Sequence, residues 1–112
     1  MTPREEAVLV RAFVCESDQC DGRPLYEIIV EEACKAGLAG ATVLRGPVGC
    51  RHDIHTELEV DARGKLPMVI EIVDGEAAIH DFLPTLDRLI GSGLITLEAV
   101  RMMRCGRREA RA

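Results

Sequence analysis

The chain is poor in aromatic side chains and contains no asparagine. Among 112 residues there is one tyrosine, two phenylalanines and no tryptophan. Sheets that bind single-stranded RNA stack bases on aromatic side chains of their central strands, so this composition excludes that function. The missing asparagine excludes the arginine–asparagine pair with which acyl phosphatases act. The composition thus excludes two functions that small α+β domains can have.

Long hydrophobic runs are also absent. Apolar stretches such as residues 7–10 and 66–70 are far too short to cross a bilayer, and residues 1–6 do not form a secretion signal. The five cysteines lack the even, closely spaced pattern of a secreted disulfide scaffold. We therefore expect a cytoplasmic protein, without membrane insertion, whose cysteines are thiols.

The net charge of −5 is unevenly distributed. Residues 101–112 hold five arginines and one glutamate, which leaves an acidic body in residues 1–100. An acidic body argues against nucleic acid as a partner, because phosphate contacts supply most of that affinity. Length and hydrophobic content predict a single domain over residues 1–112, with a core at about 7–104 and a short basic, solvated tail at 105–112.

Periodicity and turn residues predict the order strand–helix–strand, twice. Pro24 suits the first turn of a helix and Gly37 its end. Asp74 is expected to cap the second helix, and Pro84 to kink or split it. The apolar residues of the third strand predict burial on both of its faces. The predicted strands are residues 7–15, 40–44, 66–73 and 96–104, and the predicted helices are residues 24–36 and 75–90.

This order predicts an α+β fold, a ferredoxin-like βαββαβ sandwich. Right-handed crossovers place two helices on one face of a four-stranded antiparallel sheet. No helix remains to cover the other face. If that face is apolar, a partner subunit must bury it, so we expect an oligomer.

The loop after the second strand, at residues 45–56, is the candidate for binding an anion. Gly46 and Gly49 would let backbone amides approach a phosphate, and Arg45 and Arg51 can form bidentate contacts. On the last strand, Arg101 and Arg104 could add charge from the same subunit or a neighbour. The alternative is that these arginines only solvate a loop. Neither the P-loop nor the Rossmann glycine pattern is present.

The same loop is also a candidate metal site. Cys50, His52 and His55 offer a thiolate and two imidazoles within six residues. Zinc requires three or four such ligands, so a further ligand such as Cys20 or a residue of another subunit would be needed. A nucleophilic Cys50 with a histidine base is a weaker possibility, because an exposed loop does little to fix the geometry. We expect no enzymatic activity.

Six segments together resemble the PII-like domain-of-unknown-function family 190. The resemblance spans about residues 7–104, and the segments occur in the same order as in the family. Two stretches depart from its pattern, at residues 48–52 and 63–65, and both lie in the long loop. The segments are ESD (16–18), GRPLYEIIV (22–30), GLAGATV (37–43), IHT (54–56), LPMVIEIVD (66–74) and FLP (82–84).

The resemblance implies a ferredoxin-like homotrimer, similar to PII signalling proteins and CutA-type divalent-cation tolerance proteins. It implies an adenine nucleotide as effector in clefts between subunits, and a loop at about 46–65 that docks on a transporter or enzyme. The predicted function is a trimeric PII-like regulator. A metal- or redox-sensing trimer and a purely structural trimer remain alternatives. The predicted nucleotide-binding residues are Gly40, Thr42, Arg45, Gly46, Gly49, Arg51, Arg101 and Arg104.

Overall fold

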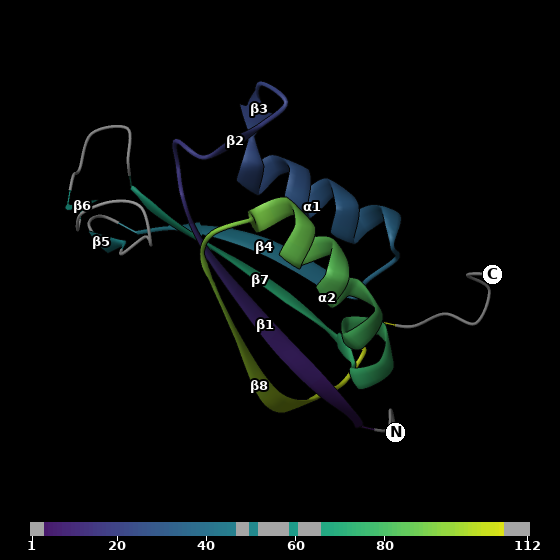
Figure 1. Ribbon diagram of the computed structural model, residues 1–112. Coiled ribbons are helices and arrows are strands. Elements are labelled where there is room, and N and C mark those ends of the chain that lie inside the picture. The colour runs from purple at the N-terminus through teal and green to yellow at the C-terminus, as the bar shows by residue number, and fades with distance from the viewer. Residues whose placement is uncertain (1–3, 47–49, 52–58, 61–65, 107–112) are drawn as a thin grey trace.

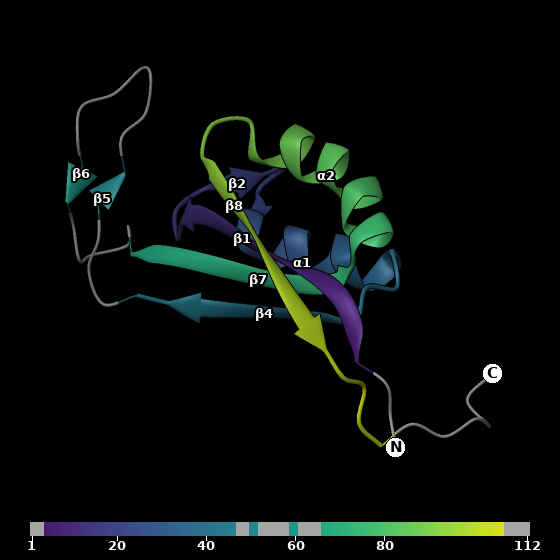
Figure 2. The same ribbon diagram turned by 90° about the horizontal axis from the view of Figure 1, so that it is seen from below.

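The computed structural model describes residues 4–46, 50–51, 59–60 and 66–106, and its centre is a four-stranded antiparallel sheet. The strand order is β4-β7-β1-β8, with β1 between β7 and β8. Helices α1 and α2 lie on the same side of this sheet (Figure 1, Figure 2). The predicted ferredoxin-like fold is confirmed. The elements of this core are β1 (Glu5–Cys15), α1 (Leu25–Lys35), β4 (Gly40–Arg45), β7 (Pro67–Gly75), α2 (Glu76–Ile90) and β8 (Leu94–Met102).

The core lies between the sheet and the two helices. Alternate residues of β1 and β7 face the helices, because successive side chains of a strand point to opposite faces. From α1 and α2, buried residues at helical spacing meet them. The largest fully buried side chains are Val10, Ile29, Ile70, Ile72, Ile79 and Leu86.

Helix α1 begins and ends near the predicted residues. Pro24 is its N-cap, one residue before the first turn, where a missing N–H costs nothing. After the C-cap, Gly37 adopts a φ of +74°, which glycine tolerates without strain. The predicted end of this helix is confirmed.

Helix α2 differs from two predictions. It continues through Pro84 to Ile90, so the predicted split is wrong. Ile79 and Leu86, on either side of Pro84, are both buried against the same core, and this packing holds the helix as one element. The N-cap is Gly75 and no side chain caps the helix, so the capping role predicted for Asp74 is also wrong.

Strand β7 is not buried on both faces. Met68, Ile70 and Ile72 are buried towards the helices, but Val69 and Val73 on the opposite side are only half-buried. The prediction was wrong because apolar residues on both sides of a strand need not be covered within one chain. In the described part of the chain, no helix covers this second side. We call it the open face; its residues include Leu9, Arg11, Phe13, Thr42, Leu44, Val69, Glu71, Val73, Leu94, Thr96 and Glu98.

Two short ladders were not predicted. Strands β2 (Gln19–Cys20) and β3 (Arg23–Pro24) form a hairpin around Asp21 and Gly22, both with positive φ. An Asp-Gly pair between two strands favours such a turn, so the sequence did contain the signal. The second ladder pairs β5 (Cys50–Arg51) with β6 (Glu59–Val60). Neither described helix has the length and apolar character needed to span a membrane.

Candidate functional site

Arg45 stands at the base of the long loop, as the last residue of β4. Its guanidinium lies 3.1 Å from the carboxylate of Glu16, which follows directly after β1. Arg45 is about half exposed and Glu16 is mostly buried. A guanidinium in this position can form bidentate contacts with phosphate oxygens, but here it faces a carboxylate of its own chain.

Backbone hydrogen bonds hold the two ends of the loop together. The amide of Gly46 donates to the carbonyl of Pro67 at 2.9 Å, and the amide of Glu16 donates to the carbonyl of Leu66 at 2.8 Å. A Cβ atom at Gly46 would lie 2.9 Å from the Pro67 ring. The Pro67 ring leaves too little room there for a side chain. Gly46 therefore has a packing role that is independent of any anion.

The turn that carries Glu16 is fixed by its own hydrogen bonds. The amide of Cys15 donates to the Asp18 carboxylate at 2.9 Å, and the amide of Asp18 donates to the carbonyl of Cys15 at 3.0 Å. The amide of Leu25 donates to the carbonyl of Asp18 at 2.9 Å and joins the turn to α1. The backbone beneath the Glu16–Arg45 pair is thus well anchored.

Arg104 belongs to a second polar cluster, near the start of β1. It contacts Glu5 at 2.9 Å and Asp74 at 3.3 Å. The hydrogen bond to Glu5 is the main reason that the pKa of Arg104 is raised above its ordinary value. Asp74 also accepts hydrogen bonds from the amides of Ala39, at 2.9 Å, and Gly75, at 2.6 Å. Arg104 therefore already binds two carboxylates of its own chain.

The other predicted residues on strands lie on the two edges of the sheet. Gly40 is the first residue of β4, opposite Val73, and a Cβ atom there would lie 3.3 Å from Val73. Thr42 is exposed on the open face, opposite Glu71. Arg101 is exposed on β8, the other edge strand.

A single chain does not bring Arg45 and Arg101 together. Arg45 is level with Val14 of β1 through Met68, whereas Arg101 is level with Glu6. Eight residues along β1 separate these levels, which corresponds to roughly 26 Å at about 3.3 Å per residue. The two arginines also lie on opposite edge strands. The predicted cations thus divide into two groups at opposite ends of the sheet.

The predicted metal ligands fall mainly outside the described residues. Gly49, His52 and His55 lie outside them, and for Cys50 and Arg51 only the backbone, in β5, is described. Among the residues that the structure describes, no group of three His, Cys, Asp or Glu side chains could hold a metal ion. The loop metal site stays a prediction.

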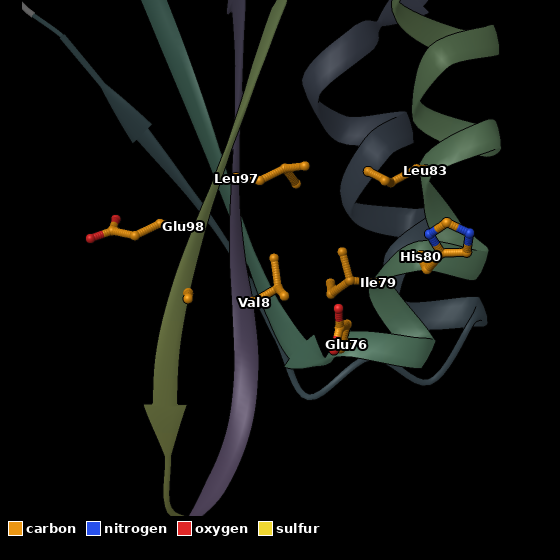
Figure 3. A pocket seen from close by; sticks show the side chains of 8 residues that line it. Val8, Glu76, Ile79, His80, Leu83, Leu97 and Glu98 are labelled. Atoms are coloured by element: carbon orange, nitrogen blue, oxygen red, sulfur yellow. The ribbon is translucent and has the colours of Figure 1, made fainter.

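A shallow groove with apolar walls and polar residues at Glu76, His80 and Glu98 runs between α2 and the edge strand β8. It encloses about 190 Å³. In Figure 3, Val8 and Leu97 face Ile79 and Leu83 across it, and Glu98 points away on the other side of the sheet. None of the predicted nucleotide-binding residues lines this groove. Its lining combines apolar side chains with two glutamates and a histidine, and it includes no guanidinium for a phosphate.

Two residues of these clusters were missed from the sequence. Glu16 was noted only within a family-like segment, and Asp74 was interpreted as a helix cap. Their partners Arg45 and Arg104 are 29 and 30 residues away along the chain. The order of the strands in the sheet, which places the end of β1 near the end of β4, brings the first pair together.

Comparison with known proteins gives matches of two kinds, in sequence and in fold. The sequence model of family DUF190, described as Uncharacterized ACR, matches residues 7–102. A UPF0166 protein of Aquifex aeolicus is 37% identical over 97 residues, which cover 85% of this chain and 91% of the relative. The matched region includes both ends of the sheet.

Solved structures share the fold at low sequence identity. CPII from Thiomonas intermedia K12, bound to ADP and bicarbonate, has a TM-score of 0.67 at 13% identity, covering 93% of this chain and 95% of CPII. CutA from Xylella fastidiosa has a TM-score of 0.58 at 18% identity, covering 86% of this chain and 83% of CutA. At these identities the likeness establishes the fold alone.

Proposed function

The chain belongs to the DUF190 family, and from this premise we propose that it is a PII-like regulatory protein. It forms a homotrimer, binds an adenine nucleotide between subunits and signals through the loop at about residues 46–65. The fold that it shares with CPII, a protein bound to ADP, supports the ligand class. We propose cytoplasmic localisation and docking of the loop on a transporter or enzyme as parts of this function.

The observation that carries the proposal is the separation of the two cationic ends. Arg45 and Arg101 lie roughly 26 Å apart along the sheet, too far to form one compact phosphate site within a chain. A cyclic trimer has heterologous interfaces, in which different surfaces of neighbouring copies meet. Such an interface can place the β4 edge of one subunit beside the β8 edge of the next. The proposed site is therefore shared between subunits.

The open face supplies the surface for assembly. Leu44, Val69, Phe13 and Leu94 form one apolar row across all four strands. Leu44 and Leu94, at the two ends of this row, are 48% and 59% exposed. Contiguous apolar surface of this kind marks an interaction site in a folded protein. Association of three copies through this face would remove the row from water.

Signalling follows from linkage between the ligand and the loop. A nucleotide that contacts Arg45 has a different affinity for each arrangement of the adjoining loop, so its binding shifts their populations. A protein that docks on the loop then senses the ligand, and by reciprocity it changes the affinity for the ligand.

The first test is mass and ligand binding of the purified chain. Light scattering should give the mass of three subunits, and calorimetry should detect one of ATP, ADP or AMP at about one site per subunit. Zinc and copper titrations in parallel test the metal-sensing alternative. Binding of a metal without any nucleotide would replace this proposal with that alternative.

A mixing experiment tests whether the site is shared. Arg45→Ala and Arg101→Ala chains should each bind nucleotide weakly as pure trimers. When the two chains are refolded together in equal amounts, each mixed trimer has one interface that keeps both arginines, so about a quarter of all sites should recover. Failure to recover any sites in mixed trimers of confirmed mass would contradict a shared site.

A further inference from the structure

We infer that Glu16 is an internal competitor for the phosphate groups of the ligand, because its carboxylate forms an ion pair with the Arg45 guanidinium. This inference rests on the proposed nucleotide binding at Arg45. It assigns to Glu16 a role in setting affinity, through a contact that an anionic ligand must replace.

The first step of the argument is the geometry of the pair. The Glu16 carboxylate and the Arg45 guanidinium are 3.1 Å apart, so the contact is a direct ion pair. Nη2 of Arg45 makes this contact, and both two-donor edges of the planar guanidinium include Nη2, so a bidentate phosphate uses the same nitrogen. On the edge that faces Glu16 the phosphate must replace the carboxylate, and on the other edge the nearby carboxylate repels it.

The second step is the rigidity of the site beneath the pair. Glu16 is anchored through its amide to Leu66, and the turn that follows is closed by two hydrogen bonds between Cys15 and Asp18. Gly46, next to Arg45, is anchored to Pro67. The competition therefore concerns two side chains on a fixed backbone. Glu16 can release Arg45 by a rotamer change, without unfolding the turn.

The third step compares Arg45 with Arg104. Arg104 contacts two carboxylates, whereas Arg45 contacts one and is about half exposed. Solvent reaches the half-exposed Arg45 and screens its single contact with the mostly buried Glu16, which makes this contact readily exchangeable. Arg45 is thus the loop-end guanidinium whose partner a phosphate can displace. The contact weakens binding of anions and leaves a neutral ligand unaffected.

The experiment is a double-mutant cycle measured by calorimetry with ATP. Glu16→Gln keeps the side-chain shape and removes the competing charge, so we expect affinity for ATP to rise roughly two- to five-fold. The gain should be smaller for AMP and absent in the Arg45→Ala background. Glu32→Gln removes a carboxylate of similar exposure on α1 and should leave affinity unchanged.

The outcomes separate this inference from the proposed function. If the native chain binds ATP and Arg45→Ala weakens binding, but Glu16→Gln binds no tighter, competition by Glu16 is wrong and the proposed function stands. An equal gain in the Arg45→Ala background would also overturn it, because the effect would then be a general loss of negative charge. If neither the native chain nor Glu16→Gln binds any adenine nucleotide, the proposed function itself fails. Thermal unfolding of each variant verifies that the fold is intact.

Discussion

The two faces of the same sheet differ in how far their side chains are buried. Towards the helices, Val10, Ile70 and Ile72 are fully buried by side chains of the same chain. The open face mixes apolar residues with polar and charged ones, and two of its apolar side chains, Leu44 and Leu94, remain about half exposed. The side chains of one chain thus bury one face of the sheet and leave the other partly exposed. Under the proposed trimer, folding of one chain and assembly of several use opposite sides of the same strands.

Charge distinguishes the two faces as well. No polar or charged side chain is buried in the described core. The middle of the open face, in contrast, carries Arg11 bound to Glu71 and to Glu98, each at 2.9 Å. The pKa of Arg11 is raised, chiefly by its hydrogen bond to Glu71. Such a group can be buried only with its partners, which favours one register of association over others.

The largest effect should follow a change on the covered face. Ile70→Ala leaves a cavity in the core, and we expect a loss of about 2–5 kcal/mol in the free energy of unfolding. Its neighbour on the open face is the matched control. Val69→Ala should cost about 1 kcal/mol in a dilute, monomeric sample. Urea unfolding followed by circular dichroism measures both. Equal losses for the two variants would contradict the difference between the faces.

A change on the open face should prevent assembly while preserving the fold. Leu44→Glu places a charge in the apolar row, and we expect light scattering to give the mass of one chain in place of three. The circular dichroism spectrum should stay native. Leu44→Met keeps the apolar character and volume, so this control should assemble normally. A Leu44→Glu chain that remains trimeric would show that Leu44 lies outside the interface.

Removal of the charged centre should have a smaller effect on assembly. Arg11→Ala leaves Glu71 and Glu98 without their shared partner, so a buried interface would hold uncompensated carboxylates. We expect a lower association constant by sedimentation equilibrium. Arg23 is also bound to carboxylates, but it lies beside α1, away from the open face. Arg23→Ala should therefore assemble like the native chain. Equal losses for both variants would remove the specific role of Arg11.

The smallest expected effect lies on the helix side, outside the core. Arg23 donates hydrogen bonds to Glu31 at 3.2 and 2.5 Å, and this contact lowers the pKa of Glu31 below its ordinary value. A carboxyl group whose pKa is lowered in the folded state stabilises the fold at pH values above its unfolded-state pKa. This stabilisation is lost as the pH falls through the folded-state pKa. Glu31→Gln should be slightly less stable than the native chain at pH 7 and equal to it in strong acid. A constant difference at all pH values would exclude this titration.

The sequence predicted the sheet and helices well because their signals are local. Alternation in β1, helical spacing in α1 and Gly37 at the helix end each depend on neighbouring residues. Predictions failed where distant partners decide the outcome. Asp74 looks like a cap, but it binds the amide of Ala39 and the Arg104 side chain from other parts of the chain. The core packing of α2 likewise keeps the helix continuous through Pro84, where the sequence allowed a split.

The sequence indicated the composition of a candidate anion site but not its arrangement. Glycines and arginines near residue 45 led to this prediction, which stays untested, and the structure places Arg45 and Gly46 at the loop end of the sheet. The sequence could not reveal that Arg45 already has a carboxylate partner in Glu16, or that Arg104 lies at the opposite end. Both facts depend on strand register, which composition does not specify. The β2–β3 hairpin, by contrast, was available from Asp21-Gly22.

The hydrogen bond from Gly46 to Pro67 has a consequence for how this fold can diversify. It closes the segment between β4 and β7 at its base, and the rest of the sheet holds that closure in place. The entropic cost of a closed loop rises only with the logarithm of its length, by about 0.6 kcal/mol per doubling. Insertions between residues 47 and 65 should therefore lower the free energy of unfolding of the domain very little. Segments of different length and sequence can then be exchanged there, while the folding of the remaining domain stays the same.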